Sequence, residues 1–213
     1  RNGSMITLDH VSKIYNLKGK PPVAAVRDAD LTVTPGEFVV ITGRSGSGKT
    51  TLLNLMAGLV KPSTGTVVLN GVDLWSLSDA EQSLLRNRTI GFVFQFPSLL
   101  PSLTALENVA LPTMFGDRNG RQDAYARAED LLHEVGLSEK LSSYPRHLSA
   151  GQQQRVVVAR SLINQPQVLM ADEPTSNLDE QTEQEIIALF QEIHRRNGVT
   201  ILLVTHGGLL VPC

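Results

Sequence analysis

The chain has 213 residues, 41% of them hydrophobic, and a mass of 23.2 kDa; this size suits one compact or two-lobed unit, and no apolar run approaches the ~18 residues that cross a membrane. Lys and Arg number 19 against 21 Asp and Glu, so the chain has no overall attraction to phosphates and we expect no nucleic-acid partner, although a local basic patch stays open. The single cysteine, Cys213, excludes an internal disulfide framework, a multi-cysteine zinc site and a buried thiol nucleophile, and fits a reducing compartment.

The N-terminal part predicts an antiparallel pair of strands. We expect residues 1–4, which precede Met5, to be additions outside the natural chain, and we expect no secretory signal, because no apolar stretch follows a basic start. Residues 5–15 and 24–34 alternate loosely and are rich in β-branched side chains, and the Gly-, Pro- and Lys-rich residues 16–22 separate them. This pattern predicts two antiparallel strands joined by a turn.

The remaining strands are expected to be parallel. Three short apolar runs, at residues 38–42, 168–171 and 200–204, lack alternation, as strands buried on both faces do. Before the last run, hydrophobic residues repeat with helical spacing at Ile186, Leu189, Phe190 and Ile193. The alternation of strand and helix predicts a βαβ core of the α/β class.

The middle of the chain predicts a helical lobe. Residues 97–147 contain no comparable strand run. One helical stripe is formed by Ala124, Ala128, Leu131, Leu132 and Val135.

A phosphate-binding loop is the strongest local signal. Residues 43–50 match the pattern G-x-x-x-x-G-K-[ST], directly after a predicted strand and before a predicted helix: Gly43, Arg44, Ser45, Gly46, Ser47, Gly48, Lys49 and Thr50. The glycines allow successive N–H groups to face one anion, and the helix start adds positive charge. We expect Lys49 to reach the β and γ phosphates, Thr50 to bind Mg²⁺ and Thr51 to donate to the α phosphate. The alternative is a glycine-rich turn into a helix that matches the pattern by chance. A chance match of these eight residues in a chain of this length has a probability on the order of one in a hundred.

Two adjacent carboxylates end the strand at 168–171. Asp172 and Glu173 would lie at the carboxyl end of a buried strand, where open α/β sheets bind ligands. In a protein with a phosphate loop, we expect Asp172 to hold the hydration shell of Mg²⁺ and Glu173 to orient or deprotonate the attacking water. The pair indicates hydrolysis, whereas the alternative is a strand end with two solvated acids.

Residues 148–155 read Leu-Ser-Ala-Gly-Gln-Gln-Gln-Arg, and Ser149 with Gln152 fits a capping box, so a helix should begin here. Together with the phosphate loop and the Asp-Glu pair, this octet resembles the signature motif of the ATP-binding cassette (ABC) family over residues 5–206. The resemblance implies an ATP-hydrolysing subunit with ATP and Mg²⁺ as cofactors. It also implies that Ser149, Gly151 and Gln152 bind the nucleotide of a second subunit, so that two cassettes, as a homodimer or a pair, enclose two ATP molecules.

The same resemblance implies the architecture. We expect one ABC ATPase domain over 1–213: a P-loop NTPase core with a mainly parallel central sheet, an N-terminal antiparallel β subdomain and an inserted α-helical subdomain. Residues 5–95 and 165–206 would form the core with the antiparallel subdomain, and residues 96–164 the helical subdomain with the signature helix.

Four further positions match the family. Gln95 matches the Q-loop residue that contacts Mg²⁺ or the water and senses the membrane partner, although a buried strand-end amide is the alternative. His206 matches the switch histidine that contacts the γ phosphate, and the alternative is a structural histidine at a strand end. Tyr15 matches the aromatic residue that stacks on adenine, and the alternative is that it packs in the core from a strand. Residues 176–179 look like the D-loop, and Asp179 also suits a helix N-cap; both roles can hold.

Two departures from the family pattern stand out. Ala150 replaces the usual glycine of the signature, which adds a methyl group beside a tight phosphate contact. After His206 the chain lacks the usual acidic residue, helix and final strands. A truncation and an unnatural end both remain open for residues 207–213.

Residues 16–22, 90–95 and 99–109 resemble the lipoprotein-release and macrolide-export branch. This implies a cassette on the cytoplasmic face of the membrane that drives an integral permease. Residues 96–109 would be the docking surface, through Phe96, Leu99, Leu100 and Leu103, although core packing of these leucines is an equal alternative.

Two other function classes share part of this sequence pattern. A cassette that regulates cell-wall remodelling or division through a permease-like partner, without transport, has the same sequence pattern. A DNA-repair or chromosome ATPase is disfavoured, because the chain has no heptad run.

Overall fold

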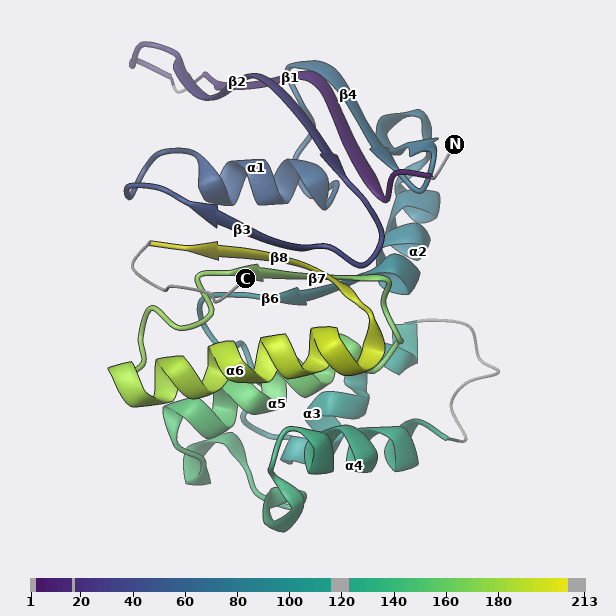
Figure 1. The fold of residues 1–213 in the computed structure, drawn as a ribbon, viewed down its shortest axis with the longest axis vertical. Coiled ribbons are helices and arrows are strands. Elements are labelled where there is room, and N and C mark those ends of the chain that lie inside the picture. The colour runs from purple at the N-terminus through teal and green to yellow at the C-terminus, as the bar shows by residue number, and fades with distance from the viewer. Residues whose placement is uncertain (1–2, 17, 116–122, 207–213) are drawn as a thin grey trace.

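The computed structural model describes residues 3–16, 18–115 and 123–206. Two four-stranded sheets form its layers (Figure 1), with orders β2-β1-β4-β5 and β3-β8-β7-β6. Residues 207–213, for which two interpretations were open, lie outside the described residues, as do residues 1 and 2 of the expected extension. No helix in the described part of the chain is both long and apolar enough to cross a membrane.

The first sheet is antiparallel throughout. β1 (Ile6–Tyr15) pairs with β2 (Val23–Val33) and β4 (Thr64–Leu69), and β5 (Val72–Asp73) pairs with β4. The predicted antiparallel pair is therefore confirmed. The sequence interpretation missed β4 and β5, although Asn70 and Gly71 between them are a hairpin signal.

The second sheet is parallel, and all its carboxyl ends lie at one edge. It contains β3 (Phe38–Thr42), β8 (Thr200–Thr205), β7 (Val168–Asp172) and β6 (Ile90–Val93). The three predicted parallel strands are confirmed. β8 is buried along its whole length, whereas β3 is only half-buried, because it lies at the edge of the sheet.

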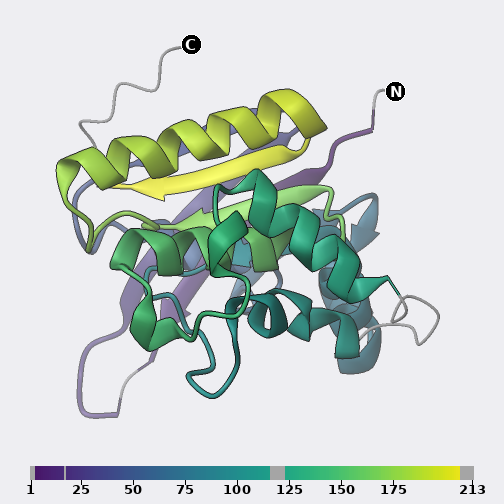
Figure 2. The same ribbon diagram turned by 90° about the horizontal axis from the view of Figure 1, so that it is seen from below.

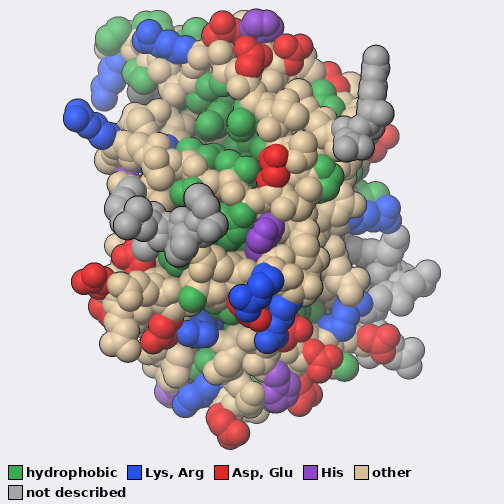
Figure 3. Space-filling model, viewed as in Figure 1, with side chains coloured by type: hydrophobic (Ala, Val, Ile, Leu, Met, Phe, Trp, Pro, Cys, Tyr) green, Lys and Arg blue, Asp and Glu red, His purple; other side chains and the backbone are tan. Residues whose placement is uncertain are grey.

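Helices cover the two faces of the parallel sheet. In Figure 1, α1 (Lys49–Met56) lies between the two sheets, and α5 (Ala150–Leu162) and α6 (Glu180–Asn197) lie against the opposite face. Each space holds its own hydrophobic core. The predicted stripe of α6 is buried as expected, at Ile186, Leu189, Phe190 and Ile193. Figure 3 shows hydrophobic side chains on the visible surface over α1, between the sheets.

The helical lobe lies beyond α5 and α6 and is seen from below in Figure 2. It contains α3 (Ala105–Ala110) and α4 (Ala124–Glu134) with short 3₁₀ turns, and the described residues between 97 and 147 contain no strand. Ala128, Leu132 and Val135 are buried, which confirms the predicted stripe. α2 (Asp79–Thr89) begins with a Ser78–Glu81 capping box, a start signal that the sequence interpretation missed.

Candidate functional site

The phosphate loop joins the end of β3 to the start of α1. Gly48 is the N-cap of α1 with φ of 93°, and it has no side chain to cap the helix. The first N–H groups of the helix therefore lack a side-chain cap from this residue, as a helix start that binds an anion requires. The loop has the strand-to-helix context that its pattern predicts.

Gly48 also lies tightly against the antiparallel sheet. A Cβ atom there would come 2.1 Å from the carbonyl oxygen of Ala25, whereas a Cβ at Gly46, which also has positive φ (75°), would meet no atom within 4 Å. We expect Gly48→Ala to lower the melting temperature clearly more than Gly46→Ala, because only the first adds a clash to the ~1–2 kcal/mol of backbone strain. Calorimetric melting of both variants without nucleotide measures this, and equal decreases would contradict the close approach.

Lys49 is almost completely buried in the loop, with 7% of its surface exposed. Its Nζ donates to the carbonyl oxygens of Gly43 at 2.8 Å and Arg44 at 3.0 Å, and lies 3.8 Å from Glu173 Oε1. The ammonium group is thus held at the centre of the loop, beside the carboxylates.

Asp172 and Glu173 follow from β7 and face the loop. Thr50 Oγ1 donates to Asp172 Oδ1 at 3.1 Å. Burial raises the pKa of Asp172 above its ordinary value, and the hydrogen bond from Thr50 is the main opposing effect. A cation bound beside Asp172 would favour its charged form, which burial disfavours.

Glu173 is positioned by both its backbone and its carboxylate. Its N–H donates to Val204 O at 2.9 Å, and its φ of 48° is unusual for a residue other than glycine. Glu173 Oε2 lies 2.6 Å from Nε2 of His206, which follows β8, and only 13% of the Glu173 side chain is exposed. The geometry suits a carboxylate that exchanges a proton with a neighbouring group.

The structure thus brings five predicted site residues together, and it separates others. The five are Lys49, Thr50, Asp172, Glu173 and His206. Gln95 follows β6 at the same edge of the sheet and is half-buried. Tyr15 ends β1 with 37% of its surface exposed and with the Lys13 ammonium 5.2 Å from its ring centre, so core packing does not describe it.

The signature residues lie on the other side of the parallel sheet, at the start of α5. The predicted capping box is present: Ser149 Oγ accepts from the N–H of Gln152 at 3.2 Å, and Gln152 Oε1 accepts from the N–H of Ser149 at 3.0 Å. Gly151 is buried, and a Cβ there would come 2.5 Å from Thr182 Cγ2 on α6, while Ala150 is exposed. Asp179 caps α6 by accepting from Thr182 N at 3.0 Å, which confirms the capping alternative for that residue.

The segment after Gln95 contains a mixed surface. Phe96 and Leu100 are exposed, whereas Leu99 packs against the core and Leu103 is half-buried. Two residues that no sequence motif indicates hold this segment. Asn108 is fully buried and bonds the backbone of residues 100, 103 and 104, and Arg160 bonds that of residues 97 and 98. Neither belongs to a motif that the sequence interpretation used.

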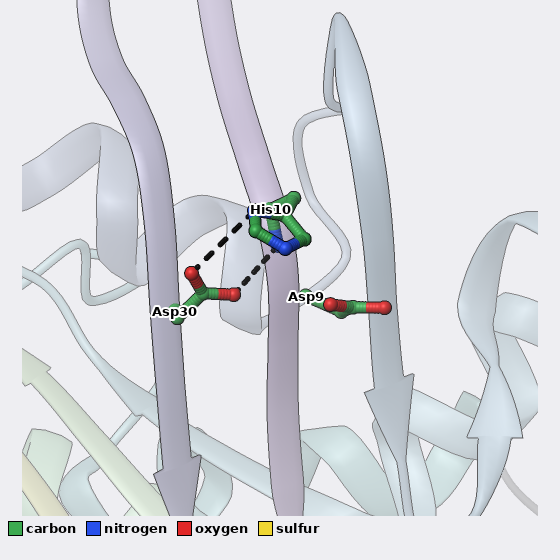
Figure 4. Close-up of side chains that lie close together, drawn as sticks. All are labelled: Asp9, His10 and Asp30. Carbon is green, nitrogen blue, oxygen red and sulfur yellow. Dashed lines mark hydrogen bonds and ion pairs between the residues drawn. The ribbon is translucent and has the colours of Figure 1, made fainter.

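A second polar cluster lies on the antiparallel sheet (Figure 4). Asp9, His10 and Asp30 are exposed and near enough to offer three metal ligands. However, Asp30 Oδ1 already accepts from the N–H of His10 at 2.8 Å, and His10 Nδ1 lies 2.8 Å from Asp28 Oδ1. The hydrogen bond to Asp28 raises the pKa of His10. These mutual contacts account for the cluster without a metal ion.

Comparisons with known proteins agree on one family. Residues 26–176 match the family model described as ABC transporter. The chain is 44% identical to the lipoprotein-releasing system ATP-binding protein LolD of Geobacter metallireducens, over 96% of this chain and 90% of LolD. It is 45% identical to the macrolide export ATP-binding/permease protein MacB of Syntrophobacter fumaroxidans, over 98% of this chain but only 29% of MacB. Among solved structures, the dimeric post-hydrolysis state of the cassette MJ0796 bound to ADP and Pi matches with a TM-score of 0.86 and 40% identity, over 95% of this chain and 88% of that one.

Proposed function

The chain belongs to the ABC transporter family, as an ATP-binding and ATP-hydrolysing subunit that powers a membrane permease, and we propose that the five side chains gathered at the edge of its parallel sheet carry out the hydrolysis. Its relatives include a lipoprotein-releasing and a macrolide-export protein, which confirms the branch that the sequence predicts. We further propose the division into a core (5–95 and 165–206) and a helical subdomain (96–164).

The single observation that carries the proposal is the contact of Glu173 with both Lys49 and His206. In the proposed mechanism, ATP lies with its phosphates in the loop 43–50, where Lys49 exchanges its loop carbonyls for the β and γ phosphates. Glu173 accepts a proton from the attacking water, and His206 holds the Glu173 carboxylate in place. Tyr15 stacks on the adenine, and Gln95, in the segment after β6, contacts Mg²⁺ or the attacking water.

The residues beside Asp172 fit a magnesium ion. A threonine hydroxyl and a carboxylate 3.1 Å apart are hard oxygen donors of the kind that Mg²⁺ prefers. We propose that Thr50 and Asp172, with Gln95, hold this ion. When bound, Mg²⁺ supplies positive charge that stabilises the transferred phosphoryl group.

A second cassette would complete each site. Ser149, Gly151 and Gln152 lie away from the phosphate loop of their own chain, at a helix start that can neutralise a phosphate. We propose that this helix start of a second copy closes over the γ phosphate in a head-to-tail dimer.

The permease would dock beside Gln95. A groove of about 290 Å³ is lined by Leu59, Phe92 and Phe94 among others, and Phe96, which follows Gln95 in the chain, has 64% of its surface exposed. Exposed aromatic side chains around a groove are typical of protein contacts. We propose that the cassette works there on the cytoplasmic face of the membrane.

The proposal is tested by phosphate release from ATP. We expect the purified chain to release phosphate from ATP when Mg²⁺ is present. Release should stop when a chelator removes Mg²⁺, because Thr50 and Asp172 then hold no ion that stabilises the transferred phosphoryl group. Phosphate release is measured continuously with and without excess chelator. A rate that does not change with Mg²⁺, or no release from folded protein, would contradict the proposal.

A further inference from the structure

Arg160 ties the signature helix to the segment that follows Gln95. It lies in the last turn of α5, where its Nη1 donates to Ser98 O at 3.0 Å and its Nη2 to Pro97 O at 3.3 Å. Two donors of one rigid guanidinium thus hold two successive backbone carbonyls. This fixes both the position and the direction of the chain at residues 97 and 98.

The charged guanidinium of Arg160 interacts with these two carbonyl groups. Among the described residues, Arg160 makes no ion pair with a carboxylate. The side chain is half-buried, and burial lowers the pKa of its guanidinium from the ordinary value. Its place near the carboxyl end of α5 is where a helix dipole favours a cation. The charge-assisted bonds to the two carbonyls are therefore its evident partners.

The segment held by Arg160 is short and irregular. Gln95 and the exposed Phe96 come directly before Pro97, and Ser98 has φ of 46° with its hydroxyl donating to Phe96 O at 3.1 Å. The backbone of residues 96–99 belongs to no helix or strand. An outside anchor is thus what such a segment needs to keep one conformation.

α5 itself is firmly placed at both ends. Near its carboxyl end, the backbone of Ser161 lies so close to β6 that a Cβ on Gly91 would be 2.2 Å from Ser161 O. Near its start, Gly151 packs against Thr182 of α6. From Ala150 to Arg160 the helix is ~15 Å long. It is a rigid connection between the signature residues and the segment after Gln95.

We propose that Arg160 is a positioning residue for ATP hydrolysis, which holds Gln95 and Phe96 in a fixed relation to the signature residues at the start of α5. This inference rests on the proposed function. Without the two bonds, residues 96–98 would change conformation independently of α5, and Gln95 would be misplaced. The phosphate loop would keep its shape, because Arg160 does not contact it.

The test compares Arg160→Ala and Arg160→Lys with the wild type in the isolated chain. We expect Arg160→Ala to lower kcat for ATP about tenfold or more while KM changes less than about twofold, because small misplacements of reacting groups reduce the rate strongly. Lysine keeps the charge but offers one donor centre instead of a planar pair, so Arg160→Lys should have an intermediate kcat. The lysine variant also serves if the alanine variant does not fold.

A matched control separates positioning from general stability. His194 on α6 is also half-buried, and its Nδ1 lies 2.9 Å from the backbone carbonyl oxygen of Val199. We expect His194→Ala to lower the melting temperature but to keep kcat within about twofold. Equal losses of kcat in both alanine variants would overturn the inference, as would an unchanged kcat in Arg160→Ala.

Hydrogen exchange gives a second measurement that needs no turnover. In Arg160→Ala, the amide of Leu100, which donates to Asn108 Oδ1 at 2.8 Å, should exchange at least about tenfold faster, while the amides of β7 and α6 stay protected. Unchanged exchange at Leu100 would overturn the inference while the proposed function stands. If the wild-type chain is protected from amide hydrogen exchange as a folded protein is but hydrolyses no ATP, the proposed function is overturned, and the inference with it.

Discussion

Glu173→Gln is expected to lower kcat for ATP hydrolysis by about 10²–10⁴-fold and to leave ATP binding intact, since a positioned general base contributes roughly this factor. Glutamine keeps the size of the side chain and can still accept a hydrogen bond from His206, but it cannot take a proton from water. Glu173 is also held by its N–H bond to Val204 O, which the substitution does not touch. Phosphate release and nucleotide titration together separate the two effects.

The same variant tests the dimer. With saturating ATP and Mg²⁺, Glu173→Gln should sediment at twice the mass of the nucleotide-free chain, because binding to one state stabilises it and hydrolysis no longer removes the ligand. Glu139→Gln makes an equal change of charge at an exposed position of the helical lobe. It should sediment and hydrolyse ATP as the wild type does. If Glu173→Gln keeps the mass of the nucleotide-free chain, or if it hydrolyses ATP normally, the assignment of the base and the dimer is wrong.

Motifs on strand ends were the most predictable part of the site. Asp172 ends a short buried apolar run, His206 follows another, and the loop before Lys49 follows β3. Parallel strands bring their carboxyl ends to one edge of the sheet, so the strand type predicts that these residues are neighbours in space. The start of α5 was equally predictable, because Ser149 and Gln152 form their capping box from residues three positions apart. Both inferences depend on local pattern and a simple rule of topology.

Contacts that depend on tertiary packing were not predictable. Arg160 lies 62 positions from Ser98, and neither residue has a local pattern that names the other. The clash at Gly48 arises from Ala25 on the other sheet, which only the folded chain brings near. β3 was expected to be buried on both faces, but its place at the sheet edge depends on strand order, which composition does not encode. β4 and β5 are different, because Asn70 and Gly71 between them form a local pattern that predicts their hairpin.

Lys49→Ala should weaken ATP binding by about 30- to 4,000-fold, because truncating one partner of a buried, hydrogen-bonded charge pair costs about 2–5 kcal/mol and each 1.4 kcal/mol is a factor of ten. The buried ammonium is the cation at the centre of the loop, and its removal also removes the hydrogen bonds that it donates to Gly43 O and Arg44 O. The phosphate charge would then face those carbonyls and the Glu173 carboxylate without the ammonium group between them.

Isothermal calorimetry with ATP measures the loss, and Lys140→Ala on the helical lobe is the control with the same change of charge. Lys49→Met keeps the length and apolar stem of the side chain, so a similar loss of affinity in both Lys49 variants would assign the effect to the charge and not to a collapsed loop. If the Kd of Lys49→Ala stayed within about threefold of the wild type, the triphosphate would not lie in this loop. The roles of Glu173, Asp172 and the second cassette would then fail with it, because each is defined by its distance from that phosphate.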